Sequence, residues 1–386
     1  MKVLSLFSGI GAFEKALDRL QVKYDLVAYC EIDKYASKSY SAIHGVDESM
    51  NLGDITKVDE KKLPKYIDLL TYGFPCQDIS VSGQQKGLFN EDGSKTRSGL
   101  FFDALRIIKE VQPVVAIAEN VKNLTSKKFA EQFKIVLESL EQAGYNNYWA
   151  VLNSKWFEIP QNRERVFIVS IRKDIDPGLF HFPNGYQLEK RMIDFLENEV
   201  DEKYFLNEKQ TANIQSWPRT SNQTKSNGIR VKQIAQLYSI DDNPQSGRIY
   251  DPCGLCPTLD TVGGGNRMPK ITTETATAVA MRGRYSEDGT VRQQIELSER
   301  EYANTITTVQ KDSMVLINGR IRKLTPKECF RLMGFDDADF EKARSLNKDS
   351  QLYKQAGNSI VVNVVQHIIQ SLIECGALQN REAKVS

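Results

Sequence analysis

Residues 2–20 read KVLSLFSGIGAFEKALDRL. Residues 3–7 form a short apolar run that is typical of a buried strand, and Gly9 and Gly11 supply a turn after it. Residues 12–20 then place apolar side chains at the spacing of one helical face. The stretch therefore predicts a strand, a glycine turn and a helix.

The same alternation of strand and helix continues through residue 175. We expect further strands at residues 24–30, 67–72, 114–118, 149–152 and 166–171, and helices at residues 100–111 and 127–143. Gly144 lies where a left-handed residue would end the last of these helices. The alternation predicts an α/β fold in which a mostly parallel sheet carries helices on both faces.

The composition is that of a globular protein of two domains, or of one large domain with an insertion. The chain has 386 residues, is 40% hydrophobic and 26% charged, and balances 51 Lys and Arg against 50 Asp and Glu. No apolar run approaches the ~18 residues that span a bilayer, so we expect no membrane segment. The six cysteines are irregularly spaced, which argues against a disulfide framework and for a reducing cytoplasm.

The pattern changes after residue 176. Residues 207–228 are polar and resemble a linker or surface loop, and residues 247–318 hold short β-prone stretches between Gly, Pro and Asp turns. Regular structure returns at Thr325-Pro326-Lys327-Glu328, which has the residues of a helix capping box. Residues 360–375 then form an apolar final helix that we expect to pack on the sheet.

Chemically reactive residues follow the predicted strands. Ligands bind beyond the carboxyl ends of parallel strands. We therefore expect one edge of the sheet to hold the residues that follow the strands, namely residues 7–11, Glu31, residues 73–77 and Glu119. Cys76 lies in Gly73-Phe74-Pro75-Cys76-Gln77, and it is either a core thiol or a nucleophile. A nucleophilic thiolate needs nearby positive charge.

Positive charge is available shortly before the last predicted strand. If residues 161–165 are extended, the side chains of Arg163 and Arg165 lie on the same face. The two arginines could then belong to a salt-bridged surface strand, or they could hold an electron-rich ring and its phosphate. Three histidines in the chain leave little room for metal or triad chemistry based on histidine.

The first glycine turn departs from the dinucleotide-binding pattern G-x-G-x-x-G, since Glu14 occupies the last glycine position. This argues against a pyrophosphate cofactor and a hydride-transferring enzyme. A turn at Gly9 and Gly11 still admits a small carboxylate-bearing ligand, and Glu31 can hold ribose hydroxyls. A nucleoside amino acid such as S-adenosylmethionine fits both features.

Together these residues resemble the cytosine-C5 DNA methyltransferase family of bacteria and phages, over nearly the whole chain and in the family's order. The resemblance rests on residues 7–11, 31–33, 53–55, 73–77, 80–87, 119–121, 161–165, 322–334 and 355–359. It implies a Rossmann-like S-adenosylmethionine-dependent methyltransferase fold with a smaller β-rich target-recognition domain. The implied function is sequence-specific DNA methylation, as in restriction-modification systems.

The resemblance also implies a mechanism and its catalytic residues. The Cys76 thiolate would add to C6 of cytosine, Glu119 would hydrogen-bond N3 and the amino group, and Arg165 would hold O2. Arg163 would hold a neighbouring phosphate or the cysteine loop. The target base must leave the duplex, and the loop of residues 80–87, with Ser80, Ser82 and Gln84 as DNA contacts, would close on the DNA.

A cofactor pocket for S-adenosylmethionine is implied in the same way. Its expected residues are Phe7, Gly9, Gly11, Glu31, Ile32, Asp54, Ile55, Pro75, Leu100, Asn358 and Ser359. Glu31 would bind the ribose, and Asp54 and Ile55 the adenine edge. Ile32 stands where the family often has an aromatic residue, which puts the strength of stacking there in doubt.

The resemblance implies three parts of the chain. Residues 1–180, completed by residues 355–386, form the catalytic and cofactor-binding domain. Residues 181–320 form the target-recognition domain, and residues 321–354 form a hinge. Within the recognition region, Thr258 and Thr305 lie in two similar β-units, both of which we expect to face double-stranded DNA. Arg267, in the glycine-rich loop after the first unit, is the expected base reader.

Several alternatives stay open at this point. The same fold could act on cytosine in tRNA, or the chain could be an inactive DNA-binding regulator, although intact Cys76, Glu119 and Arg165 argue against the latter. Cys253 and Cys256 lack a second ligand pair, so a turn explains them better than zinc does. We expect a cytoplasmic monomer in a prokaryotic or phage-infected cell. A cognate restriction endonuclease would be a functional rather than a physical partner.

Overall fold

The computed structural model shows a chain that divides into two compact units. The first comprises Met1–Leu152, Glu164–Asn184 and Val362–Ser386, and the second comprises Asn153–Arg163 and Gly185–Val361. The residues that the structure describes are 1–75, 78–79, 86–205, 214–215, 233–237, 248–250, 255–257, 270–271, 278–285, 291–297, 314–317 and 320–378. The functional division at residues 180, 320 and 354 stays a prediction.

The first unit is built on a six-stranded sheet with the strand order β2-β1-β3-β4-β7-β5. Its strands are β1 (Lys2–Leu6), β2 (Asp25–Cys30), β3 (Leu69–Tyr72), β4 (Val115–Val121), β5 (Tyr145–Asn153) and β7 (Glu164–Arg172). The strands β2, β1, β3 and β4 are parallel, and β7 pairs with β4 in the antiparallel direction. The sheet is therefore mostly parallel, as the strand–helix alternation predicts.

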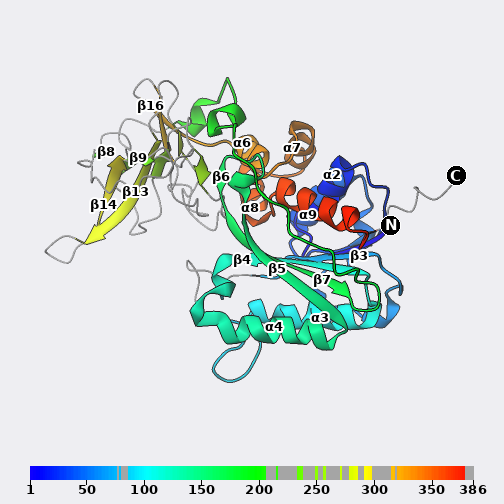
Figure 1. Ribbon diagram of the computed structural model, residues 1–386. Helices are drawn as coiled ribbons and strands as arrows, with labels where there is room; N and C mark the ends of the chain where they lie inside the picture. The colour runs from blue at the N-terminus through cyan, green and yellow to red at the C-terminus, as the bar shows by residue number, and fades with distance from the viewer. Residues whose placement is uncertain are drawn as a thin grey trace. The chain divides into compact units, whose positions relative to one another are not determined.

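Helices cover both faces of this sheet. They are α1 (Ala12–Arg19), α2 (Lys34–His44), α3 (Phe101–Val111), α4 (Ala130–Gln142) and α9 (Val362–Glu374). Figure 1 shows α3 and α4 along one face, and α2 and α9 along the other. Buried side chains of β1, β3, β4, α3 and α4 form one hydrophobic cluster, which includes Leu70, Ile107 and Val136. The predicted α/β fold class is confirmed.

The ends of these elements follow from local sequence. Gly144, just past α4, has φ 99°, which an L-residue rarely adopts, and its N–H bonds to the Glu141 carbonyl at 3.0 Å. The strand expected at residues 114–118 continues to Val121, so Glu119 lies within it rather than after it. β4 extends this far because it pairs with β7 in an antiparallel ladder, and Val121 and Arg165 are the last pair of that ladder.

The second unit contains an eight-stranded sheet with the order β10-β12-β16-β15-β13-β14-β9-β8. In chain order its strands are β8 (Ile214–Gln215), β9 (Gln233–Leu237), β10 (Arg248–Tyr250), β12 (Lys270–Ile271), β13 (Ala278–Tyr285), β14 (Val291–Leu297), β15 (Met314–Ile317) and β16 (Arg320–Lys323). A separate parallel pair joins β6 (Gln161–Asn162) to β11 (Cys256–Pro257). Strands thus occur where the β-prone stretches lie.

Three helices, α6 (Pro326–Arg331), α7 (Asp337–Arg344) and α8 (Asp349–Asn358), follow β16 in the second unit. The capping box predicted at Thr325 is present: its hydroxyl accepts from the Glu328 N–H at 3.2 Å, and the Glu328 carboxylate accepts from the Thr325 N–H at 2.8 Å. Glu328 also forms a buried ion pair with Arg322 at 2.8 Å. Among the helices in the described residues, none has the length and apolar character needed to cross a membrane.

Candidate active site

The turn after β1 requires glycine. Gly9 and Gly11 have φ values of 56° and 81°, and Phe7 before them is also left-handed at 51°. A Cβ added to Gly11 would lie 2.0 Å from Nε2 of His44 on α2, while that nitrogen lies 3.1 Å from the Ile10 carbonyl oxygen. The turn therefore presents backbone rather than side chains at the carboxyl end of β1.

Glu31, at the end of β2, is held beside this turn. Its Oε2 accepts from the Gly9 N–H at 2.8 Å, and its Oε1 accepts from the Asp33 N–H at 2.8 Å. The Asn51 side chain bonds both the N–H and the carbonyl of Glu31 at 2.9 Å. The adjacent Ile32 side chain is 74% exposed. An acid fixed next to an exposed apolar side chain suits a ligand with hydroxyls and a flat ring.

Asp54 and Ile55 differ in what they offer a ligand. The Asp54 carboxylate caps a short turn by accepting from the Thr56 hydroxyl at 2.8 Å and N–H at 3.0 Å, and these bonds lower its pKa. Ile55 is buried in the hydrophobic cluster, against which Phe7 and Leu100 are also packed, both only partly buried. Of the expected cofactor residues in the first unit, Ile32 is therefore the most open apolar surface.

Cys76 itself lies outside the described residues, but the chain on either side of it is held. The Asn120 side-chain amide donates to the Phe74 carbonyl at 3.0 Å, and its oxygen accepts from the Val121 N–H at 2.8 Å. The Asn123 amide donates to the Ile79 carbonyl. The end of β4 and the short helix after it thus contact the chain on both sides of Cys76.

Glu119 and Arg165 form an ion pair, with 3.0 Å between Oε1 and Nε. They come from the paired strands β4 and β7, and both side chains are largely buried, at 12% and 17% exposure. A second pair, Lys122 with Glu164, lies on the same two chain segments at 2.9 Å but is about half exposed. The predicted acid and guanidinium are therefore neighbours at the carboxyl end of β4.

Arg163 belongs to the second unit and is 4% exposed. Its guanidinium donates to the carbonyls of Gly357 at 3.1 Å and Ser359 at 2.7 Å. This links the arginine motif to the last motif within that unit, in which Ser359 is buried and Asn358 is exposed. A contact of Arg163 with a phosphate or with the cysteine loop stays a prediction.

Three of the cysteines that the structure describes are buried and are poor nucleophiles. Burial, with a smaller contribution from Glu31, raises the pKa of Cys30 to about 12. Burial also raises the pKa values of Cys256 and Cys329 well above the ordinary range. These thiols remain protonated at neutral pH. Within the part of the chain that the structure describes, no group of three or more His, Cys, Asp or Glu side chains could hold a metal ion.

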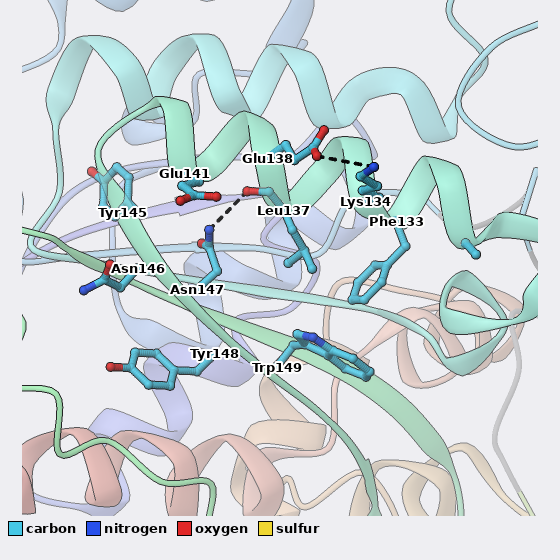
Figure 2. Close-up of a pocket in the computed structure, with 11 residues that line it drawn as sticks. Phe133, Lys134, Leu137, Glu138, Glu141, Tyr145, Asn146, Asn147, Tyr148 and Trp149 are labelled. Carbon is cyan, nitrogen blue, oxygen red and sulfur yellow. Dashed lines mark hydrogen bonds and ion pairs between the residues drawn. The ribbon is translucent and has the colours of Figure 1, made fainter.

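The residues predicted to contact DNA fall outside the described part of the chain. They are Ser80, Ser82, Gln84, Thr258, Arg267 and Thr305. A described pocket of about 640 Å³ lies elsewhere, between α4 and the edge strand β5. Figure 2 shows the residues that line it, including Phe133 and Trp149. The rings of these two residues pack edge to face, with 5.0 Å between their centroids. None of the predicted site residues lines this pocket.

Sequence reasoning missed three residues that hold the site. Asn120 and Asn123 support the cysteine segment, and His44 lies behind the glycine turn. The two asparagines follow the acid closely in Glu119-Asn120-Val121-Lys122-Asn123, and this proximity was an available signal. No signal in the sequence indicated His44, because this residue contacts the glycine turn from the carboxyl end of α2.

Comparison with known proteins gives a consistent result. A family profile for C-5 cytosine-specific DNA methylases matches residues 1–374. The chain is 37% identical to the orphan methyltransferase M.SPBetaI of Bacillus phage SPbeta, over 97% of each chain. It is 32% identical to the type II methyltransferase M.HhaI of Haemophilus parahaemolyticus, over 96% of this chain and 94% of that one.

Solved structures agree on the fold. The crystal structure of the S. pombe Dnmt2 methyltransferase has a TM-score of 0.59 and 21% identity, covering 97% of this chain and 98% of that one. The matched profile and the relatives, together with an acid and an arginine at the end of β4, lead to one conclusion. The chain belongs to the family of C-5 cytosine-specific DNA methylases.

Proposed function

We propose that this chain transfers the methyl group of S-adenosylmethionine to C5 of a flipped-out cytosine in double-stranded DNA, through covalent addition of Cys76 to C6. One observation carries the proposal. The Glu119–Arg165 pair lies at the strand end that Asn120 ties to Phe74, two residues before Cys76. This supports the inference that the acid, the guanidinium and Cys76 act at one site.

The roles of these residues follow from the chemistry of cytosine. C5 is a weak nucleophile until a thiolate adds to C6, which places electron density on C5. A proton held by Glu119 at N3 stabilises the adduct, and Arg165 holds O2. S-adenosylmethionine supplies an electrophilic methyl group when it is bound. After C5 has been methylated, it loses its proton, the C6–S bond breaks and Cys76 leaves as thiolate.

The described residues fit such a cofactor. The Gly9 and Asp33 N–H groups hold the Glu31 carboxylate at the end of β2, where its oxygens can accept from ribose hydroxyls. The exposed Ile32 side chain next to it offers an apolar face for the adenine ring. Pro75, Leu100, Asn358 and Ser359 are proposed as further contacts by resemblance.

Glu31→Ala should weaken S-adenosylmethionine binding by about 1.5–3 kcal/mol, the usual contribution of a hydrogen bond to a charged group. Affinity for DNA without cofactor should barely change. Calorimetric titration measures the cofactor affinity, and Glu48→Ala, which removes an exposed acid after α2, is the control. Unchanged cofactor affinity in Glu31→Ala would remove Glu31 from the site.

Methyl transfer to tRNA is the alternative within the same fold. Incubating the protein with labelled S-adenosylmethionine and either duplex DNA or total tRNA separates the two substrates. We expect label in DNA, with 5-methylcytosine as the product. Label confined to tRNA would overturn the proposed substrate, and label in neither would favour an inactive DNA-binding protein.

Recognition of a DNA word is proposed for the second unit, through the two β-units around Thr258 and Thr305. Base contacts carry sequence information, whereas phosphate contacts mainly set register and affinity. Altering residues 263–267, which end at Arg267, should relax or shift the methylated word. Thr305→Ala should lower methylation at all sites alike. Methylome sequencing decides, and an unchanged word in the loop variant would make the first β-unit a scaffold only.

The biological setting also remains a proposal. Relatives carry names of both kinds, orphan methyltransferases of Bacillus phages and type II methyltransferases of bacteria. A cognate restriction endonuclease for this chain therefore stays a prediction, as do its monomeric state and its place in the cytoplasm.

A further inference from the structure

We propose that Asn120 and Asn123 are positioning residues for Cys76, acting as a two-point clamp on the segment that carries it. This inference rests on the proposed function, because it assumes that Cys76 is the nucleophile. It adds two residues to the mechanism, neither of which touches the reacting atoms.

The first contact of the clamp lies before the cysteine. Asn120 is 2% exposed and lies on β4 next to Glu119. Its amide donates to the Phe74 carbonyl at 3.0 Å, while its oxygen is fixed by the Val121 N–H. The Asn120 side chain therefore has one orientation, and the peptide that leads into Pro75 and Cys76 takes its position from β4.

The second contact lies after the cysteine. Asn123, in the short helix that follows β4, donates to the Ile79 carbonyl. Asp78 is also held, since its N–H donates to the Ser98 hydroxyl and its carboxylate accepts from the Ser98 N–H, both at 3.3 Å. Only four residues, 75–78, separate the two clamped carbonyls, so the span of chain between the two contacts is short.

The clamp also joins the nucleophile to the acid. Asn120 and Asn123 flank the end of the strand that carries Glu119, which pairs with Arg165 on β7. The clamp thus connects the chain on both sides of Cys76 to the strand end that carries the Glu119–Arg165 pair. A positional error of about 1 Å between reacting groups can cost 10²-fold in rate.

Replacing each asparagine with aspartate tests the clamp. Aspartate keeps the size and the acceptor oxygen but cannot donate to a carbonyl. We expect kcat to fall by roughly 10- to 100-fold in Asn120→Asp and in Asn123→Asp. The rate of covalent trapping by 5-fluorocytosine DNA should fall in parallel. The KM for DNA and the Kd for S-adenosylmethionine should stay within about threefold of wild type.

Asn147→Asp is the matched control. Asn147 lies on β5 in the pocket of Figure 2, where its amide donates to the Leu137 carbonyl at 3.1 Å and its oxygen accepts from Ser170 at 2.7 Å. The substitution removes the same kind of bond far along the chain from Cys76. It should lower the unfolding temperature about as much as the clamp variants do, yet leave kcat unchanged.

The outcomes separate the clamp from the mechanism. If both clamp variants keep the kcat of Asn147→Asp while Cys76→Ser is inactive, the clamp is wrong and the proposed function stands. A rise in KM with an unchanged trapping rate would likewise overturn the clamp. If Cys76→Ser remains active, both proposals fail. Asn123→Asp alone decides the matter should the buried Asn120→Asp fail to fold.

Discussion

Cys76→Ser should reduce methyl transfer to background while leaving the fold intact. One sulfur-to-oxygen change preserves the shape of the side chain. A free cysteine has a pKa of about 8.5, whereas a serine hydroxyl forms almost no anion at neutral pH, so the nucleophile is lost. Labelled methyl transfer to DNA measures the loss, and the covalent complex with 5-fluorocytosine DNA should disappear as well.

Cys375→Ser is the control for this variant, since Cys375 is a partly buried cysteine just after α9. It should methylate and trap DNA like the wild type. Methylation by Cys76→Ser at a rate near that of Cys375→Ser would contradict a covalent mechanism at Cys76. Unfolding temperatures of the two variants show whether any loss of activity reflects the fold.

Glu119→Gln should lower the rate of methyl transfer by about 10²- to 10⁴-fold, the usual contribution of a positioned acid or base. Glutamine fills the same space but cannot carry the proton to N3. The substitution also leaves the Arg165 guanidinium, 17% exposed, without its carboxylate partner. Single-turnover methyl transfer at saturating DNA and cofactor isolates the chemical step from binding.

Glu164→Gln separates acid catalysis from the loss of an ion pair. Glu164 pairs with Lys122 at 2.9 Å on the same two chain segments, and its side chain is 43% exposed. An exposed pair of this kind contributes about 0–1 kcal/mol to stability, so little should change. Equal activities of Glu119→Gln and Glu164→Gln would show that Glu119 is not the acid.

Much of the first unit could be predicted because its signals are local. Apolar runs, the glycines at 9, 11 and 144, and alternating elements are sequence patterns with a direct backbone cause. The carboxyl ends of parallel strands then meet at one edge, which brings together residues far apart in the chain. Glu119 and Arg165, 46 positions apart, were expected at one site because they match the acid and arginine motifs of the family, and they form an ion pair.

The supporting contacts could not be predicted, because they depend on which side chain reaches which backbone group. Arg163 bonds to carbonyls nearly 200 positions further along the chain, at residues 357 and 359. The Asn120 amide donates to the Phe74 carbonyl from the part of β4 that continues past Glu119 alongside β7. Such contacts satisfy buried backbone groups, and no periodicity in the sequence records them.

Bisulfite sequencing of DNA from cells that express the protein tests whether it methylates cytosine at C5 through Cys76. The host should lack its own cytosine-C5 methyltransferases, and cells expressing Cys76→Ser serve as the reference. We predict that cytosines at one position of a single short DNA word resist conversion with the wild-type protein, and that none do so with Cys76→Ser. Complete conversion with both proteins, or equal protection by both, would contradict Cys76-dependent methylation of cytosine in DNA.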